Sequence, residues 1–341
     1  YSSYKYYKYQ IVNNGTTYYV CDIYAKAASP DSIAAQIIDI NQGTNYGSKD
    51  NYVNPFGNNG TDSKLYSDAI IYEMHIRDWS RAAVADSTGK FLDIANSDEI
   101  INHLKDIGIT HVQILPMFDY AQVNSDLNYN WGYNPYHYNV PEGRYVEYST
   151  GDGIEAVNQM RSMIEKLHEA GIAVIMDVVY NHTSGTQGGS LYDSTVPYYY
   201  YRLNADGSYS NGSGCGNETD SEAPMFKKYM IETLKHWMLD YHINGFRFDL
   251  MGLHSKETMA EIYKELSAID SNVLVYGEPW TGGDARVKNG CTGSVPSEAY
   301  GVGAFDDDFR DAIKGAEFGG FNAGEVQGVF NSEGISAGLK G

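Results

Sequence analysis

The chain lacks several features that would place it in common functional classes. It has no apolar run of the roughly 18 residues that a membrane-spanning helix needs, so we expect no membrane insertion. Its three cysteines, Cys21, Cys215 and Cys291, are odd in number and lack metal-ligand spacing, which excludes a disulfide-stapled scaffold. Basic residues are scarce: 24 Lys and Arg against 44 Asp and Glu give a formal charge of −20, which argues against nucleic acid or an acidic membrane surface as partner.

Two further absences concern the start of the sequence and cofactors. No signal-peptide pattern opens the sequence, and its first residue is Tyr1 rather than Met, so we expect that an upstream part has been removed or omitted. No G-x-G-x-x-G turn follows the first predicted strand, which argues against a dinucleotide-binding open sheet. We expect that no cofactor is required.

Tyrosine, by contrast, is abundant. The chain holds 31 of them, many in Asn-, Gly- and Ser-rich segments rather than in apolar periodic ones. Amphipathic rings on loops stack on the flat apolar faces of sugar rings, so this composition favours an uncharged carbohydrate partner over a polyanion. A length of 341 residues allows one (β/α)8 barrel of about 250 residues and a small appendage.

Residues 1–66 differ in pattern from the rest. Short Tyr, Val and Ile runs alternate with turn signals, of which Asn14-Gly15 predicts a hairpin. The stretch is too short to bury a core of its own, so we interpret it as the remnant of an N-terminal β-sandwich domain and a linker. Residues 67–341 repeat strand, loop and helix, and we interpret them as one barrel domain.

Six strands are predicted in the barrel domain, at residues 69–74, 111–115 and 173–179, from Gly245, from Val273, and at 302–305. Near-continuous apolar strands that alternate with amphipathic helices indicate a parallel sheet covered by helices. Polar residues follow several different strand ends, which favours a (β/α)8 TIM barrel over an open sheet. The loop 183–224 after the third strand is too long for an ordinary connection and is typical of a functional excursion.

Two acidic residues close neighbouring predicted strands: Asp249 ends the fourth and Glu278 ends the fifth. The carboxyl ends of parallel strands meet at one edge, so we expect both carboxylates there, with Arg247 beside them. One carboxylate held ionised by a guanidinium and one kept protonated by an apolar wall are what glycoside hydrolysis requires. Taken alone, an acid after a strand is more often a strand-end cap, here paired with Arg247, than a catalytic group.

Other segments strengthen the enzymatic interpretation through a family resemblance. Residues 177–182 (DVVYNH), 245–249 (GFRFD) and 277–280 (GEPW) resemble, in order, the first three signature regions of the α-amylase superfamily, glycoside hydrolase family 13. Residues 129–135 (YNWGYNP), 140–145 (VPEGRY) and 212–217 (GSGCGN) are similar to the signature of type I pullulanases. Asn134 departs from that signature, where Asp is usual, and is closer to glycogen-debranching relatives.

The resemblance implies a role for each matching residue. It implies that Asp249 is the nucleophile, that Glu278 is the acid/base and that Arg247 orients Asp249. Further residues are implied to bind substrate: Asp177, His182 and Tyr133 on the non-reducing side of the cut, Trp280 on the leaving side, and Trp131 within the Tyr133 segment.

Calcium is a further expectation that the resemblance carries. Asn181 resembles a position that binds Ca²⁺ in some α-amylases. For Asp206, which lies in an oxygen-rich loop, we prefer an Asx turn to a metal site.

The family's fourth signature region, a His-Asp pair after the seventh strand, is not found in the sequence, and neither are strands seven and eight. We therefore expect the barrel to be truncated before strand seven, which would leave an unpaired strand edge in the chain alone. We therefore expect the chain to be inactive alone, with the rest of the enzyme in another chain or a missing segment.

The leading hypothesis is a retaining hydrolase that cleaves α-1,6 branch linkages in pullulan, starch or glycogen-type α-glucans. The alternatives are an α-1,4-acting or dual-specificity amylase and a non-catalytic α-glucan-binding fragment. Composition suits an extracellular or cell-surface polysaccharide degrader, and a cytoplasmic location is the alternative.

Overall fold

The computed structural model describes residues 5–42, 44, 46–57, 66–83, 89–293, 301–316 and 322–340. By internal contacts the chain divides into a large unit, residues 1–303, and a small unit, residues 304–341. None of the described helices is both long and apolar enough to cross a membrane.

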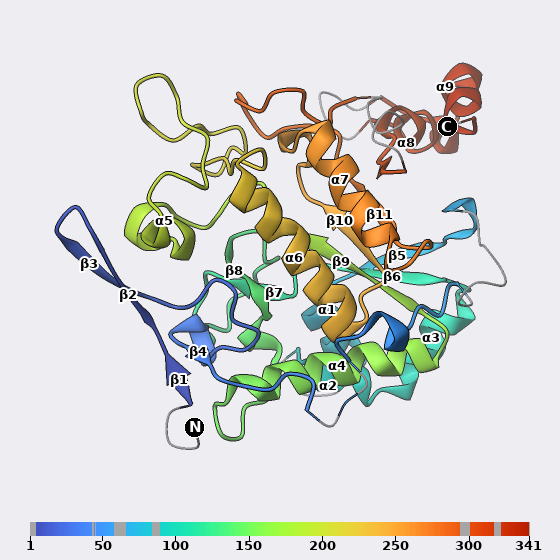
Figure 1. Cartoon of the computed structure of the whole chain (residues 1–341). Coiled ribbons are helices and arrows are strands. Elements are labelled where there is room, and N and C mark those ends of the chain that lie inside the picture. Colours follow the sequence, from blue (N-terminus) through green and yellow to red (C-terminus); the bar gives the residue numbers. More distant parts are fainter. Residues whose placement is uncertain are drawn as a thin grey trace. The chain divides into compact units, whose positions relative to one another are not determined.

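A six-stranded sheet in the order β12-β11-β10-β9-β6-β5 is the centre of the fold (Figure 1). Its strands are β5 (Ile71–Met74), β6 (His111–Ile114), β9 (Ala173–Val178), β10 (Gly245–Phe248), β11 (Leu274–Gly277) and β12 (Gly303–Ala304). The pairings from β5 to β11 are all parallel and follow the order of the chain. The prediction of an incomplete (β/α)8 barrel with strands one to six is thereby confirmed.

Helices follow the strands and are arranged around the sheet in Figure 1. They are α1 (Ile76–Ala83), α2 (Phe91–Ala95), α3 (Asp98–Asp106), α4 (Gly153–Glu169), α5 (Leu191–Thr195), α6 (Pro224–Tyr241) and α7 (Lys256–Ser267). Ser97 caps the start of α3, because its hydroxyl accepts a hydrogen bond from the Ile100 N–H at 3.2 Å. In the small unit, α8 (Asp307–Lys314) and α9 (Ser332–Gly338) are capped by Asp306 and Asn331.

The core of the large unit lies between the sheet and these helices. Every residue of β6, β9 and β10 is buried, which explains why their sequences are nearly continuous in apolar residues. On α4 the buried face includes Val157, Met160 and Ile164, which recur at helical spacing. Close packing between the sheet and these helices fixes the position of the carboxyl end of each strand.

The N-terminal segment forms two small antiparallel sheets. One pairs β1 (Tyr6–Tyr7) with β4 (Ala35–Gln36), and the other pairs β2 (Tyr9–Asn13) with β3 (Thr16–Val20). The turn of the second is Asn14-Gly15, with φ of 47° and 79°, which confirms the predicted hairpin. The predicted boundary between a β-domain remnant at 1–66 and a barrel at 67–341 stays a prediction.

One pair of strands was not predicted. After β6 the chain forms β7 (Phe118–Tyr120) and β8 (Pro135–Pro141), which pair antiparallel with two register irregularities. The segment between them contains Trp131 and Tyr133, so this excursion carries part of the pullulanase-like signature toward the end of the barrel. The irregular register hides the alternation of apolar and polar residues by which a hairpin is usually recognised.

Candidate active site

Strand register brings the key polar residues together. In the parallel pairing of β9 with β10, Arg247 is the partner of Asp177, and in that of β10 with β11 it is the partner of Tyr276. Asp249 and Glu278 follow directly on the ends of β10 and β11. Gly277 permits this close approach, since a Cβ there would lie 2.4 Å from the Phe248 carbonyl oxygen.

Arg247 binds all three carboxylates of the site. Its Nη1 donates to Asp177 Oδ1 and to Asp249 Oδ1, each at 3.0 Å, and its Nη2 donates to Glu278 Oε1 at 2.5 Å. A planar guanidinium presents its donors in a fixed fork, so it fixes the two strand-end acids relative to each other. The structure therefore brings Asp249, Glu278 and Arg247 together, as the sequence predicted.

The side chains of the two strand-end acids are partly exposed, whereas that of the neighbouring Asp177 is buried. The Asp177 side chain is fully buried, whereas those of Asp249 and Glu278 are 14% and 17% exposed. Burial raises the pKa of Asp177 to about 7 and also raises the pKa of Glu278 above its ordinary value. A carboxyl group that keeps its proton at higher pH is suited to act as a general acid.

The backbone after β10 also holds Glu278. The Leu250 N–H donates to Glu278 Oε2 at 2.8 Å, and Leu250 lies in the left-handed region with φ of 42° and ψ of 51°. A bulky residue in that conformation costs of the order of 1–3 kcal/mol and is found mainly where function requires it. The strained turn aims one amide at the carboxylate of the neighbouring strand.

Tyr133 and His182 close one side of the site. The Tyr133 hydroxyl donates to Asp177 Oδ2 at 2.7 Å, and its ring centre lies 5.9 Å from the Arg247 guanidinium carbon. The His182 ring nitrogens face two carbonyl oxygens, Nδ1 that of the Asn181 side chain at 2.7 Å and Nε2 that of the Tyr133 backbone at 3.1 Å. Burial lowers the pKa of His182, and the neutral ring, which has a single N–H, can donate to only one of these two oxygens.

The predicted excursion 183–224 is anchored beside the site by a buried ion pair. Arg202 Nη1 lies 3.0 Å from Glu218 Oε1, and the two side chains are 5% and 0% exposed. The same nitrogen donates to the Leu253 carbonyl after β10, while the Arg286 N–H after β11 donates to both oxygens of Glu218. One pair thus connects the loops that follow three successive strands of the site.

The tip of that excursion lies near the acids. Cys215 is exposed, whereas Cys21 and Cys291 are buried. Burial raises the pKa of the Cys215 thiol, and the negative charge of Asp249 raises it further. The segment 212–217 therefore lies within electrostatic reach of Asp249.

Two predicted binding residues lie outside this hydrogen-bonded cluster. Trp280 is half-buried two residues after Glu278, and Trp131 is 61% exposed on the segment between β7 and β8. Within the described residues no hydrogen bond or ion pair joins either indole to Arg247 or its carboxylates. Both rings are free to contact a ligand that reaches past the acids.

The calcium expectation at Asn181 stays a prediction. Its Nδ2 donates to the backbone oxygen of Asp249 at 2.9 Å and to Oδ2 of that residue at 2.8 Å, while its Oδ1 faces His182. Across the described ranges, no group of three His, Cys, Asp or Glu side chains is arranged to hold a metal. Asp206 accepts the Ser208 N–H at 3.0 Å, which confirms the Asx turn.

Sequence reasoning missed several supporting residues. Tyr276 donates to Gln113 Oε1 at 2.5 Å, and Gln113 Nε2 donates to Glu73 Oε2 at 2.7 Å, so polar groups of three strands continue the site. A polar residue inside an apolar strand was the available signal for Gln113. The Leu250 amide carried no signal, because its role depends on a backbone conformation.

Comparison with known proteins agrees with this geometry. The family described as the alpha-amylase catalytic domain matches residues 85–203. The pullulanase of Bacillus subtilis (strain 168) is 34% identical over 266 residues, which are 74% of this chain and 37% of that protein. Pullulanase 1, chloroplastic, of Arabidopsis thaliana is 33% identical over 75% of this chain and 32% of its own length.

Solved structures extend the similarity to nearly the whole chain. The pullulanase of Paenibacillus barengoltzii, in complex with maltohexaose and alpha-cyclodextrin, has a TM-score of 0.86 and 34% identity, covering 98% of this chain and 53% of that one. The Bacillus acidopullulyticus pullulanase has a TM-score of 0.83 and 36% identity, covering 97% and 41%.

The fold and the paired strand-end acids are those of a glycoside hydrolase barrel. The chain belongs to the α-amylase superfamily, glycoside hydrolase family 13. Its relatives named above are pullulanases, and the chain spans about a third of the length of the curated ones.

Proposed function

We propose that this chain carries the catalytic acids of a retaining hydrolase that cleaves α-1,6 branch linkages in pullulan, starch or glycogen-type α-glucans. The observation that carries the proposal is the binding of Asp249 and Glu278 by the two terminal nitrogens of Arg247. Retaining enzymes need a nucleophile and an acid/base too close together for a water to attack between them. Two carboxylates bound to one guanidinium are held near each other, which supports this arrangement.

In the proposed first step, the Asp249 carboxylate attacks the anomeric carbon while the glycosidic bond breaks. Glu278 gives its proton to the departing oxygen, so the leaving chain departs as an alcohol and a glycosyl ester remains on Asp249. In the second step Glu278, now ionised, takes a proton from water as that water attacks the same carbon. Asp249 is released, and the anomeric configuration is retained after two inversions.

Neighbouring side chains are proposed to position the sugar. The Tyr133 ring offers a face for stacking, and Asp177 and His182 lie beside it. Trp280 and Trp131 are proposed to contact glucan beyond the cleaved bond and along the signature segment.

The rest of the enzyme is also part of the proposal. The described parallel sheet has six strands, whereas a closed barrel of this class has eight. We propose that another segment supplies the last two strands and the third carboxylate of the family, and that the chain alone is inactive.

The test is hydrolysis of pullulan by the complete enzyme with Asp249→Asn or Glu278→Gln. Both substitutions should reduce turnover by several orders of magnitude, since each removes a group that reacts. Near-normal turnover by either variant would overturn the assignment. Release of maltotriose from pullulan supports α-1,6 cleavage, release of panose supports the α-1,4 alternative, and binding without turnover by the unsubstituted enzyme supports the binding-fragment alternative.

A further inference from the structure

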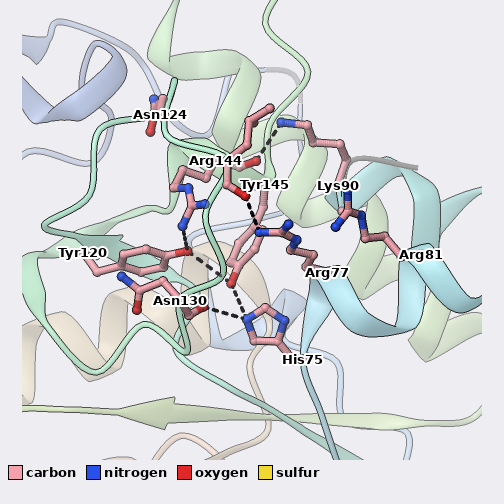
Figure 2. Close-up of a pocket in the computed structure, with 11 residues that line it drawn as sticks. His75, Arg77, Arg81, Lys90, Tyr120, Asn124, Asn130, Arg144 and Tyr145 are labelled. Atoms are coloured by element: carbon pink, nitrogen blue, oxygen red, sulfur yellow. Dashed lines mark hydrogen bonds between the residues drawn. The ribbon is translucent and has the colours of Figure 1, made fainter. Parts of the chain in front are cut away.

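A second group of cations lies outside the carboxylate site, around a cavity of about 40 Å³ (Figure 2). Arg77 and Arg81 of α1, Lys90 before α2 and Arg144 after β8 line this cavity. One water needs roughly 10–15 Å³ on this measure, so the cavity has room for about three waters or one tetrahedral oxyanion. Three segments distant in sequence thus direct positive charge toward one small space.

Of these four cations, Arg77, Lys90 and Arg144 form no ion pair with a carboxylate in the described parts of the chain. They donate instead to uncharged oxygens. Arg77 binds the Leu127 carbonyl, Lys90 binds the carbonyls of Arg144 and Val146, and Arg144 binds the Tyr120 hydroxyl and Gln122 Oε1, at distances of 2.7–3.1 Å. Their positive charge is therefore not neutralised by direct contact with an acid.

Three acids near the cavity have other partners, and a fourth, Glu147, acts on Lys90 through its charge. Glu142 is fully buried, burial raises its pKa well above the ordinary value, and its oxygens accept the N–H groups of Tyr120 and Arg144. Asp93 accepts the backbone N–H of Lys90, and Asp78 accepts the Tyr129 hydroxyl. None of these carboxyls lies in direct contact with the three cationic groups.

Asn124 supplies a second, independent observation. It lines the cavity, and its buried Nδ2 and Oδ1 have no hydrogen-bond partner among the described residues. Buried polar atoms are nearly always satisfied, so an unpaired amide that borders a cavity points to a water or a ligand there. Its N–H group would complement the cations on an acceptor-rich ligand.

We propose that this cavity binds a phosphate group. Guanidinium and ammonium groups recognise phosphate through short charge-assisted hydrogen bonds, and three of them with an amide match its oxygens. The group could come from free phosphate or from a phosphate monoester on a glucan. Asn130 lines the cavity, and Tyr133, three residues later, lies in the active site. A glucan bound in the active site could therefore place a phosphate ester in the cavity. The glucan ester, unlike free phosphate, rests on the proposed function.

The test is calorimetric titration of the complete enzyme with inorganic phosphate at constant ionic strength. Saturable binding is expected, and Arg144→Gln should weaken it by about tenfold or more, because a hydrogen bond to a charged group is lost. Arg77→Gln should act alike and serves as the second variant if Arg144→Gln does not fold. Lys228→Gln, which removes one exposed charge on α6, is the matched control and should leave the affinity unchanged.

Glucose 6-phosphate and glucose distinguish the two sources. Tighter binding of the sugar phosphate than of inorganic phosphate, with no binding of glucose, indicates an ester on a glucan; equal binding indicates the free anion. Absence of saturable phosphate binding, or equal affinity in the parent and both arginine variants, overturns the proposal. Phosphate binding should persist in Asp249→Asn, so the phosphate proposal can hold or fail independently of the proposed hydrolysis.

Discussion

Asn181 binds Asp249 twice, with Nδ2 at 2.9 Å from the backbone oxygen and 2.8 Å from carboxylate Oδ2. Arg247 holds the other carboxylate oxygen, Oδ1. The proposed nucleophile is thus fixed from both sides by residues on two neighbouring strand ends. A carboxylate held in one orientation avoids part of the entropic cost of reaching the reactive geometry.

Asn181→Ala should therefore lower kcat of the complete enzyme by roughly tenfold to a hundredfold, because a hydrogen bond to a charged group contributes about 1.5–3 kcal/mol. KM should change much less, since Asn181 orients the nucleophile rather than the substrate. Steady-state kinetics on a branched glucan measures both. Asn102→Ala, at an exposed site on α3, is the control, and an equal fall in kcat there would contradict the role of Asn181.

Asp177 predicts a pH dependence of stability. Its pKa is about 7 in the folded chain, against an ordinary value of 3.8. Between these pH values the folded state binds more protons than the unfolded state, so the contribution of Asp177 to stability falls as pH rises from about 4 to about 7. Urea unfolding should show that Asp177→Asn gains stability relative to the parent over this range. A parent that gains relative to the variant would reverse the sign and contradict the account.

The Arg202–Glu218 pair predicts a large loss of stability when one partner is removed. Arg202→Met leaves the buried Glu218 carboxylate without its cation, which should reduce the free energy of unfolding by about 3–5 kcal/mol. Adding Glu218→Gln should recover part of this loss. Lys228→Met breaks the exposed pair with Glu232 and should cost less than about 1 kcal/mol. Equal losses in the two single variants would show that the buried pair does not anchor the excursion.

Cys215 offers a probe of the charge on Asp249. Alkylation requires the thiolate, so the exposed Cys215 should react before the buried Cys21 and Cys291. Asp249→Asn removes a negative charge that raises the pKa of Cys215, and alkylation should become faster. Mass spectrometry of iodoacetamide-treated chain measures the rate. Asp284→Asn is the control. Faster alkylation of Cys215 in Asp284→Asn but not in Asp249→Asn would show that Asp249 does not act on this thiol.

Much of the fold could be predicted because it depends on local patterns. Apolar runs located the parallel strands, and Asn14-Gly15 located the hairpin. The strand-end acids were found because a charged residue after an apolar run is visible in the sequence, and parallel topology places such residues at one edge.

The remaining features depend on contacts between distant segments. Glu218 is an ordinary loop glutamate until Arg202 and the Arg286 amide surround it. The cavity beside Arg77 and Arg144 joins residues more than sixty positions apart, and no periodicity links them. Leu250 adopts a left-handed backbone conformation, for which glycine would be the usual signal. Because Leu250 is bulky, nothing in the sequence indicated this strained turn.

The most direct test of the account is to trap the glycosyl ester on Asp249. Glu278→Gln in the complete enzyme should still react with an α-maltotriosyl fluoride, because fluoride departs without a proton, but should hydrolyse the ester slowly without its base. Peptide mass spectrometry should then find a maltotriosyl group on the peptide that contains Asp249, and none when Asp249→Asn is added. A sugar attached to any other residue, or rapid turnover of the fluoride by the Asp249→Asn variant, would contradict the assignment.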